Sequence, residues 1–102
     1  MAKRPVTTTS YLILEALAAG YGYGFDIMDA TGLASGSVYP ALRRFERDKL
    51  VGAKWERVST AREEGRPPRR YYKLTARGHG ALTEARARYG ALGRLTAPPK
   101  QA

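Results

Sequence analysis

The stretch SGSVYPALRRFERDKLVGAKW, residues 35–55, changes its hydrophobic period partway along. In its first half, Val38, Leu42 and Phe45 recur at spacings of four and three residues, which predicts a helix with one apolar face. We expect this helix to begin near Gly36. The opposite face of the helix gathers polar and basic side chains, namely Ser37, Pro40, Arg43, Arg44 and Arg47.

From Val51 onward the period becomes two. Val51, Ala53 and Trp55 alternate with small or polar residues, which predicts a strand with one buried face. A tryptophan on such a face is most often buried under the sheet, so we expect Trp55 to fill the core.

A second strand is predicted over residues 70–74, with Tyr72 and Leu74 facing inward. The segment between the two strands, residues 58–69, is polar and charged and contains Gly65 and two prolines. This composition is typical of a long, mobile hairpin loop.

Two helices are expected before the opening stretch. Thr9 or Ser10 can cap the first of them, which runs to about Ala19. A second helix of about two turns follows and stops near Gly32, and Ser35 can then cap the third helix.

A final helix is expected over residues 76–96, with Thr75 as its cap. Its apolar residues follow a 3-4-3 spacing typical of a narrow coiled-coil seam: Leu82, Ala85, Tyr89 and Leu92. Four glycines weaken this helix by about 1 kcal/mol each, so we expect a partner helix to cover the seam. Residues 1–8 are expected to be a flexible basic arm, and residues 97–102 a disordered tail.

The order of the expected elements is helix, helix, short turn, helix, two strands, helix. It predicts a mainly helical α+β fold, the winged helix-turn-helix, with a two-stranded wing and a C-terminal dimerisation helix. The DNA-binding domain would span residues 9–75. In such a fold the third helix enters the major groove, and the wing follows the DNA backbone or the adjacent minor groove.

The composition favours a nucleic-acid partner. Eighteen Lys and Arg residues oppose nine Asp and Glu residues, which gives a net charge of +9 and points to nucleic acid, an anionic membrane surface or an acidic protein. The chain has no cysteine and one histidine, and no apolar run approaches the ~20 residues of a membrane helix. We therefore expect a cytoplasmic protein that is no enzyme and that holds no metal or cofactor.

Several blocks of the sequence resemble the PadR family of bacterial transcriptional regulators. They are GYGFDI at residues 22–27, GSVYPALRRFE at residues 36–46, and GRPPRRYY at residues 65–72. The likeness spans roughly residues 11–87 and implies a homodimeric repressor, which binds an inverted repeat and is released by a small molecule or another signal. The segment at residues 29–35 is shorter than is usual in that family, so we expect a tighter turn there.

The same resemblance implies which residues meet DNA. Ser37, Tyr39 and Arg43 would discriminate bases, unless Tyr39 is a core aromatic, and the basic wing residues would meet phosphates. The candidate DNA-binding residues are Ser35, Ser37, Tyr39, Pro40, Arg43, Arg44, Arg47, Arg66, Pro68, Arg69, Arg70 and Lys73.

The remaining candidate residues belong to a dimer and to an effector site. Dimer contacts are expected from the first and last helices, at Tyr11, Leu14, Leu82, Ala85, Tyr89 and Leu92. A small hydrophobic or aromatic effector would bind near Trp55, Tyr89 and Leu92.

Two other functions are compatible with this sequence. An architectural protein would bind double-stranded DNA without sequence preference, and an adaptor would use its basic face on an acidic protein partner. A footprint with two half-sites about one helical turn apart would separate a repressor from an architectural protein, whereas an adaptor would show weak, sequence-blind affinity for DNA.

Overall fold

The computed structural model describes residues 6–96, with side chains described through residue 90. Seven elements follow one another in this range: α1 (Thr8–Ala18), α2 (Gly24–Thr31), α3 (Ser35–Arg47), β1 (Val51–Trp55), α4 (Val58–Glu63), β2 (Arg70–Leu74) and α5 (Ala76–Thr96). The expected mainly helical α+β architecture with a two-stranded sheet is confirmed. No helix in the described range is long and apolar enough to cross a membrane.

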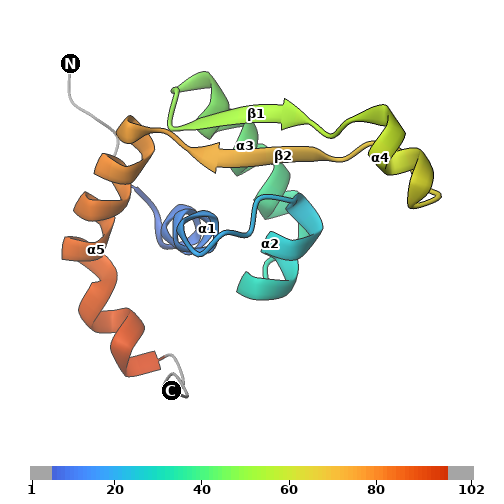
Figure 1. Ribbon diagram of the computed structural model, residues 1–102. Coiled ribbons are helices and arrows are strands. Elements are labelled where there is room, and N and C mark those ends of the chain that lie inside the picture. Colours follow the sequence, from blue (N-terminus) through green and yellow to red (C-terminus); the bar gives the residue numbers. More distant parts are fainter. Residues whose placement is uncertain (1–5, 97–102) are drawn as a thin grey trace.

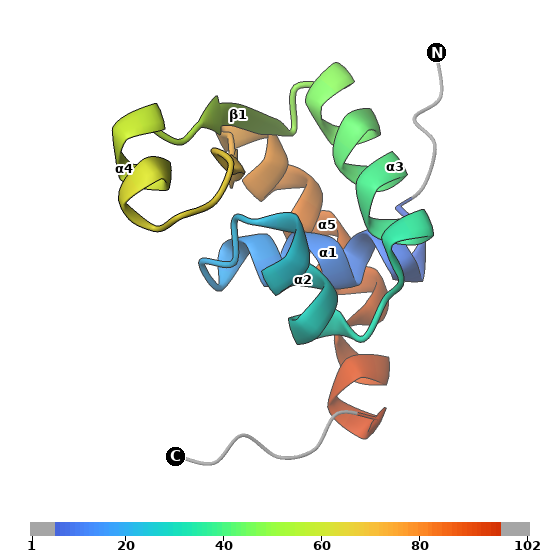
Figure 2. The same ribbon diagram turned by 90° about the vertical axis from the view of Figure 1, so that its right-hand side faces the viewer.

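Helix α1 runs through the middle of the molecule, with α5 on one side of it and α2 on the other (Figures 1 and 2). Its apolar side chains meet those of α2 and α3, and the largest fully buried ones are Ile13, Leu14, Ile27, Val38 and Leu42. Burying a side chain of this size stabilises the fold by roughly 1.5–3 kcal/mol. The core therefore fixes α3 against α1 and leaves the other face of α3 outside.

The helix starts differ from the sequence prediction by one to three residues. The N-cap of α1 is Thr7, whose hydroxyl accepts a hydrogen bond from the Ser10 amide at 3.1 Å, so the prediction of Thr9 or Ser10 was wrong. The run TTTS offers four similar caps, and Val6, directly before Thr7, packs against the core. Ser35 is the first residue of α3 and makes no capping bond, so that prediction was also wrong.

The turn between α2 and α3 is short. Gly32 adopts φ 75°, a left-handed conformation that ends α2 where predicted, and residues 32–34 alone separate the two helices. Three residues therefore connect the two helices.

Strands β1 and β2 pair antiparallel, from Val51 opposite Leu74 to Trp55 opposite Arg70. Val51 and Leu74 are buried at the base of the hairpin. Trp55 is 60% exposed, so the prediction that it fills the core was wrong. The reason is that the hairpin extends past the helices, as Figure 1 shows, and Trp55 stands at its far end.

The segment predicted as a loop contains a helix, α4, which corrects the expectation of an irregular hairpin loop. Ala61 in this helix is only 1% exposed. Gly65 ends α4 with φ 71°, and the Arg66 amide donates to the Ala61 carbonyl oxygen at 3.1 Å. These are the features of a glycine-terminated helix end, so the wing has a folded tip.

Helix α5 is capped as predicted, because the Gly78 amide donates to the Thr75 hydroxyl at 3.0 Å. Leu82 and Ala85 are buried inside this chain, and Tyr89 stacks on Tyr11 of α1 at 5.5 Å. Of the predicted seam, Leu82, Ala85 and Tyr89 therefore pack within the same chain, so these three residues do not need a partner helix to cover them.

Candidate nucleic-acid interface

The outer face of α3 carries the first group of candidate residues. Ser35, Gly36 and Arg43 are exposed, while Ser37 and Pro40 are half-buried. Within the described part of the chain, no ion pair or hydrogen bond engages the Arg43 side chain. From Ser35 to Arg43, the outer face of α3 thus presents a glycine, small hydroxyls and one free guanidinium.

Tyr39 points toward the start of α2. A Cβ atom on Gly24 would lie 2.5 Å from the Tyr39 hydroxyl, so the ring rests directly on this glycine. Burial raises the pKa of Tyr39, with smaller contributions from Tyr23 and Tyr72. This position agrees with the alternative that Tyr39 is a core aromatic.

Arg44 and Arg47 differ from Arg43. Arg44 is half-buried and donates to the Ser10 hydroxyl at 3.3 Å, and exposed Arg47 pairs with Asp48 at 3.3 Å. Ten residues of helix separate Arg47 from Ser37, or about 15 Å at 1.5 Å per residue. Arg47 therefore stands at the opposite end of α3 from Ser37, about one turn beyond Arg43.

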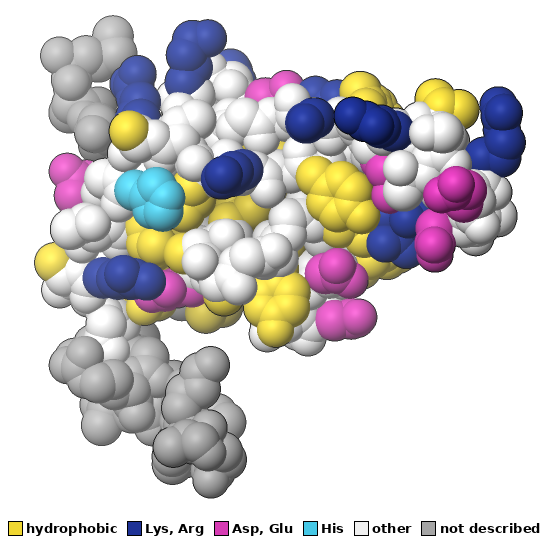
Figure 3. All heavy atoms as spheres, in the orientation of Figure 1, with side chains coloured by type: hydrophobic (Ala, Val, Ile, Leu, Met, Phe, Trp, Pro, Cys, Tyr) yellow, Lys and Arg dark blue, Asp and Glu magenta, His cyan; other side chains and the backbone are white. Residues whose placement is uncertain are grey.

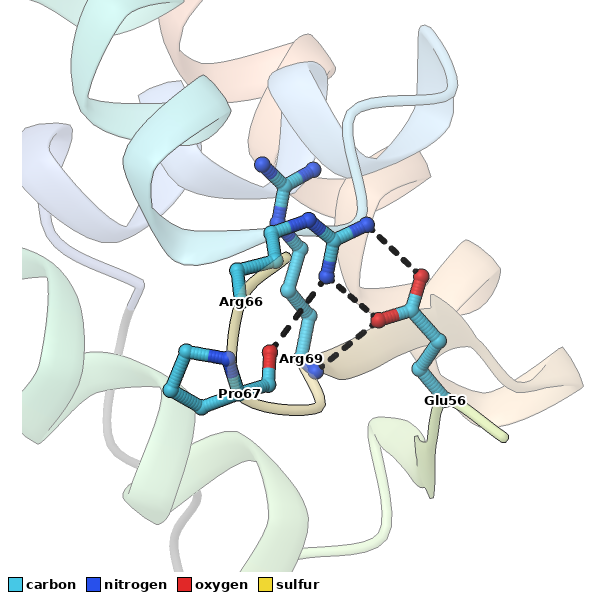
Figure 4. A network of polar contacts seen from close by, with 4 residues as sticks. All are labelled: Glu56, Arg66, Pro67 and Arg69. Atoms are coloured by element: carbon cyan, nitrogen blue, oxygen red, sulfur yellow. Dashed lines mark hydrogen bonds and ion pairs between the residues drawn. The ribbon is translucent and has the colours of Figure 1, made fainter. Parts of the chain in front are cut away.

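The wing is closed by a network around Glu56, shown in Figure 4. Arg66 donates to both carboxylate oxygens of Glu56, at 2.5 and 2.9 Å, and the Arg69 amide donates to one of them at 3.2 Å. The hydrogen bonds from Arg66 lower the pKa of Glu56, and the pair is largely shielded, with the side chains 23% and 11% exposed. Arg66 is therefore occupied within the wing.

Arg69 and Arg70 fasten the wing to the helices. The Arg69 guanidinium lies 4.4 Å from the ring centroid of Tyr23, which precedes α2. Arg70 donates to Glu46 of α3 at 2.8 Å and lies over the Trp55 ring at 5.2 Å. A backbone bond from the Tyr72 amide to the Gly22 carbonyl oxygen, at 2.8 Å, adds a further anchor.

Other basic residues of the wing, among them the following three, are free. Lys54, Arg57 and Lys73 are exposed, and none has an ion pair among the described residues. The pairing of Lys54 with Tyr71, and of Gly52 with Lys73, places the two lysines on one face of the sheet. Figure 3 shows basic side chains along this hairpin and at its tip.

Sequence reasoning included Lys73 but missed Lys54 and Arg57. The alternation of β1 could have revealed Lys54, because it occupies an outward position of the strand. Pro68 is exposed at the turn, as expected for a surface residue.

The expected dimer and effector residues do not form one site. Tyr11, Leu14, Leu82 and Ala85 are buried in the core, and the Tyr89 hydroxyl donates to the Val6 carbonyl oxygen at 2.7 Å. Trp55 lies on the wing and Tyr89 on α5, in separate regions of the molecule (Figure 1). The side chain of Leu92 lies outside the described residues. No group of three metal-ligating side chains occurs in the described range.

Comparison with known proteins gives a family and a fold. The family model of the transcriptional regulator PadR-like family matches residues 13–84. A PadR-like transcription factor from Bacteroides fragilis is 30% identical, with a TM-score of 0.66 and 84% of each chain covered. No curated protein matches the sequence.

Two further solved structures share the fold. A PadR family transcription regulator from Clostridium difficile R20291 is 22% identical, with a TM-score of 0.71, over 87% of this chain and 94% of that one. The PcaV transcriptional regulator from Streptomyces coelicolor, solved in complex with its natural ligand, is 21% identical, with a TM-score of 0.66, over 95% of this chain and 68% of that one.

Proposed function

This chain belongs to the PadR-like family of transcriptional regulators, and we propose that it acts as a homodimeric repressor that binds an inverted-repeat operator and is released by a small molecule. DNA binding and transcriptional regulation follow from the family. The observation that carries the proposal is the free, exposed guanidinium of Arg43 on the outer face of α3.

The outer face of α3 from Ser35 to Arg43 is the base-reading segment of the proposed complex. Gly36 has no side chain and open space around it, so the helix can approach the groove closely. Ser37 and Arg43 would then contact base edges. An arginine that bonds guanine through two hydrogen bonds contributes about 1–3 kcal/mol of discrimination.

The wing would contact phosphates through its free cations, Lys54, Arg57 and Lys73. Arg66, Arg69 and Arg70, which we expected to meet phosphates, would instead position the wing through Glu56, Tyr23 and Glu46. A wing held in its binding geometry loses less conformational entropy when it docks.

A dimer is supported by the length of α5. Its last turns continue beyond the rest of the described chain, as Figures 1 and 2 show. Because Leu82 and Ala85 are already buried, we place the dimer contact on this projecting end, with Leu92 as its candidate residue. A two-fold dimer would match an operator with two half-sites about one helical turn apart.

Release by a small molecule is supported by the fold of the ligand-bound neighbour, PcaV. An effector must bind the DNA-free and DNA-bound states with different affinity, because equal affinity shifts no equilibrium.

The test is fluorescence anisotropy across a salt series, with DNA from upstream of this gene and with a scrambled duplex. We expect the upstream DNA to bind at least about a thousandfold more tightly than the scrambled duplex. Arg43→Ala should reduce that ratio roughly tenfold or more. Lys54→Ala should weaken both duplexes alike and lower the salt slope by about one.

Arg86→Ala is the matched control, because it removes a positive charge from α5, where Arg86 pairs with Glu15 at 2.9 Å. It should leave the preference for the upstream DNA unchanged. Equal binding of both duplexes at every salt concentration would favour the architectural function, and weak binding of both would favour the adaptor.

A further inference from the structure

A cavity of about 730 Å³ lies between the end of α3, the residues that connect it to β1, and the first turns of α5. Its size falls within the roughly 300–1,000 Å³ typical of small-molecule sites. The apolar part of its wall comes from Val6, Leu50, Ala81 and Ala85. The cavity is remote from the first half of α3 and from the wing tip, so the proposed DNA contacts do not use it.

The polar part of the wall is mostly cationic. Arg47, Lys49, Arg77 and Arg88 line the cavity against two carboxylates, those of Asp48 and Glu84. Asp48 is engaged by Arg47 at 3.3 Å. Within the described chain, Lys49, Arg77 and Arg88 have no ion-pair partner, although Arg88 lies over the Tyr89 ring at 5.8 Å. Unpaired cations therefore border an apolar wall.

Lys49 stands where the local backbone favours glycine. Its φ is 63°, the one positive value at a non-glycine among the described residues. The position ends α3, because the Lys49 amide donates to the Glu46 carbonyl oxygen at 3.1 Å and the Leu50 amide to the Phe45 carbonyl oxygen at 2.8 Å. Helix ends of this kind are usually occupied by glycine, which adopts positive φ without strain.

The positive charge of Arg77 also stands at a locally unfavourable position. It lies in the first turn of α5, which contains no acidic residue, and a positive charge there opposes the positive end of the helix dipole. The amino end of a helix attracts anions instead. Residues that violate local preferences without structural compensation are most often found at functional sites. Both such residues line this cavity, and both are cations.

We propose that this cavity binds a small amphipathic organic anion, with its negative group between Lys49 and Arg77 and its apolar body against Leu50, Ala81 and Ala85. Because Arg47 is the last residue of α3 and lines the same cavity, the bound anion changes how α3 sits against α5. This regulatory consequence rests on the proposed function, whereas the binding site does not. By thermodynamic linkage, the bound anion changes the protein's affinity for DNA by the same factor by which bound DNA changes its affinity for the anion.

The test uses a pair of fluorescent probes that differ in one charge: anilinonaphthalene sulfonate and its neutral parent, phenylnaphthylamine. The variants are Lys49→Gly and Arg77→Glu, with Arg62→Ala on α4 as the matched control. Lys49→Gly places glycine at a positive φ, and Arg77→Glu places a negative charge at the amino end of α5. Each substitution should therefore raise the Tm by roughly 2–6 °C. Each should also weaken sulfonate binding about tenfold or more and leave binding of the neutral probe unchanged.

A rise in Tm together with a loss of sulfonate affinity supports the site, because the loss cannot come from unfolding. The site is overturned if Lys49→Gly and Arg77→Glu bind the sulfonate as the wild type does. It is equally overturned if they lose both probes in step, since the cavity would then recognise apolar bodies alone.

The DNA experiment separates the two proposals. We expect the sulfonate to weaken operator binding by the wild type several-fold, and to have no such effect on Lys49→Gly. If the operator binds but the sulfonate leaves its affinity unchanged, the coupling to α3 is wrong. If the wild type shows no operator preference while the cavity variants still discriminate between the probes, the repressor proposal fails and the anion site stands.

Discussion

Single residues at close contacts hold this fold in place. Gly78, in the first turn of α5, lies against the Leu50 backbone, and a Cβ atom there would collide with the Leu50 carbonyl oxygen. Gly80, two residues later, has open space around it. The two glycines occupy the same helix but have different physical roles, which their sequence context does not distinguish.

Gly78→Ala should therefore destabilise the protein by about 1–3 kcal/mol, because backbone must move to admit the methyl group. Gly80→Ala should stabilise it by about 1 kcal/mol, since alanine favours a helix interior and nothing obstructs it. Urea unfolding followed by circular dichroism measures both. Equal effects of the two substitutions would mean that α5 does not pack on the α3–β1 connection as described.

Between elements, charge pairs define how the wing is held. The Glu56–Arg66 pair closes its tip, and the Arg70–Glu46 pair joins β2 to α3 at 2.8 Å. The exposed Trp55 ring lies under the guanidinium of Arg70, which pairs with Glu46. Trp55 also directly precedes Glu56, which pairs with Arg66. Trp55 is the sole tryptophan of the chain, so its fluorescence reports on the wing alone.

The wing should loosen in acid. The pKa of Glu56 is lowered below its ordinary value of 4.5, chiefly by hydrogen bonds from Arg66, so the ionised carboxylate is favoured in the folded wing. The stabilisation is therefore complete above pH 4.5 and is lost as the pH falls through the folded pKa. We expect the Arg69 amide resonance and the Trp55 fluorescence to change together over this range.

Glu56→Gln should remove this dependence on pH and shift both signals toward their acid values at neutral pH. The Glu15–Arg86 pair supplies an internal comparison, because Arg86 also lowers the pKa of Glu15 but joins α1 to α5. If Glu56→Gln titrates as the wild type does, the wing is not held by this carboxylate.

At the scale of the whole molecule, the proposed dimer depends on the arrangement of α5. The apolar residues of its first part are buried against α1, while its last turns project from the body (Figure 1). A dimer built on the projecting end would keep both α3 helices outward. It would also leave each chain folded without its partner.

Leu92→Glu should therefore convert the proposed dimer into a folded monomer. Sedimentation should give a mass near 11.2 kDa for the variant and about twice that for the wild type. Circular dichroism should show an unchanged helix content, and DNA affinity should fall by orders of magnitude, because one chain reaches one half-site. A wild-type protein that sediments as a monomer bound to DNA would contradict this assembly.

Local patterns in the sequence were sufficient for the order of the elements other than α4 and for most of their bounds. The period of Val38, Leu42 and Phe45, the alternation that begins at Val51, and the stop at Gly32 each depend on neighbours a few residues apart. The cap at Thr75 is local in the same sense. The winged helix arrangement followed from these signals because helix and strand periodicity are properties of short segments.

The roles of the charged and aromatic residues depended on contacts between distant segments. Arg70 meets Glu46, 24 residues away, and Arg69 lies over Tyr23, so the wing arginines that looked free are engaged. Trp55 belongs to the alternating pattern of apolar residues that predicts a half-buried strand, but the hairpin extends past the helices beneath it. A pattern shows which residues can pair or be buried. Whether they do depends on which surfaces the fold brings together, and that is a property of the packed molecule.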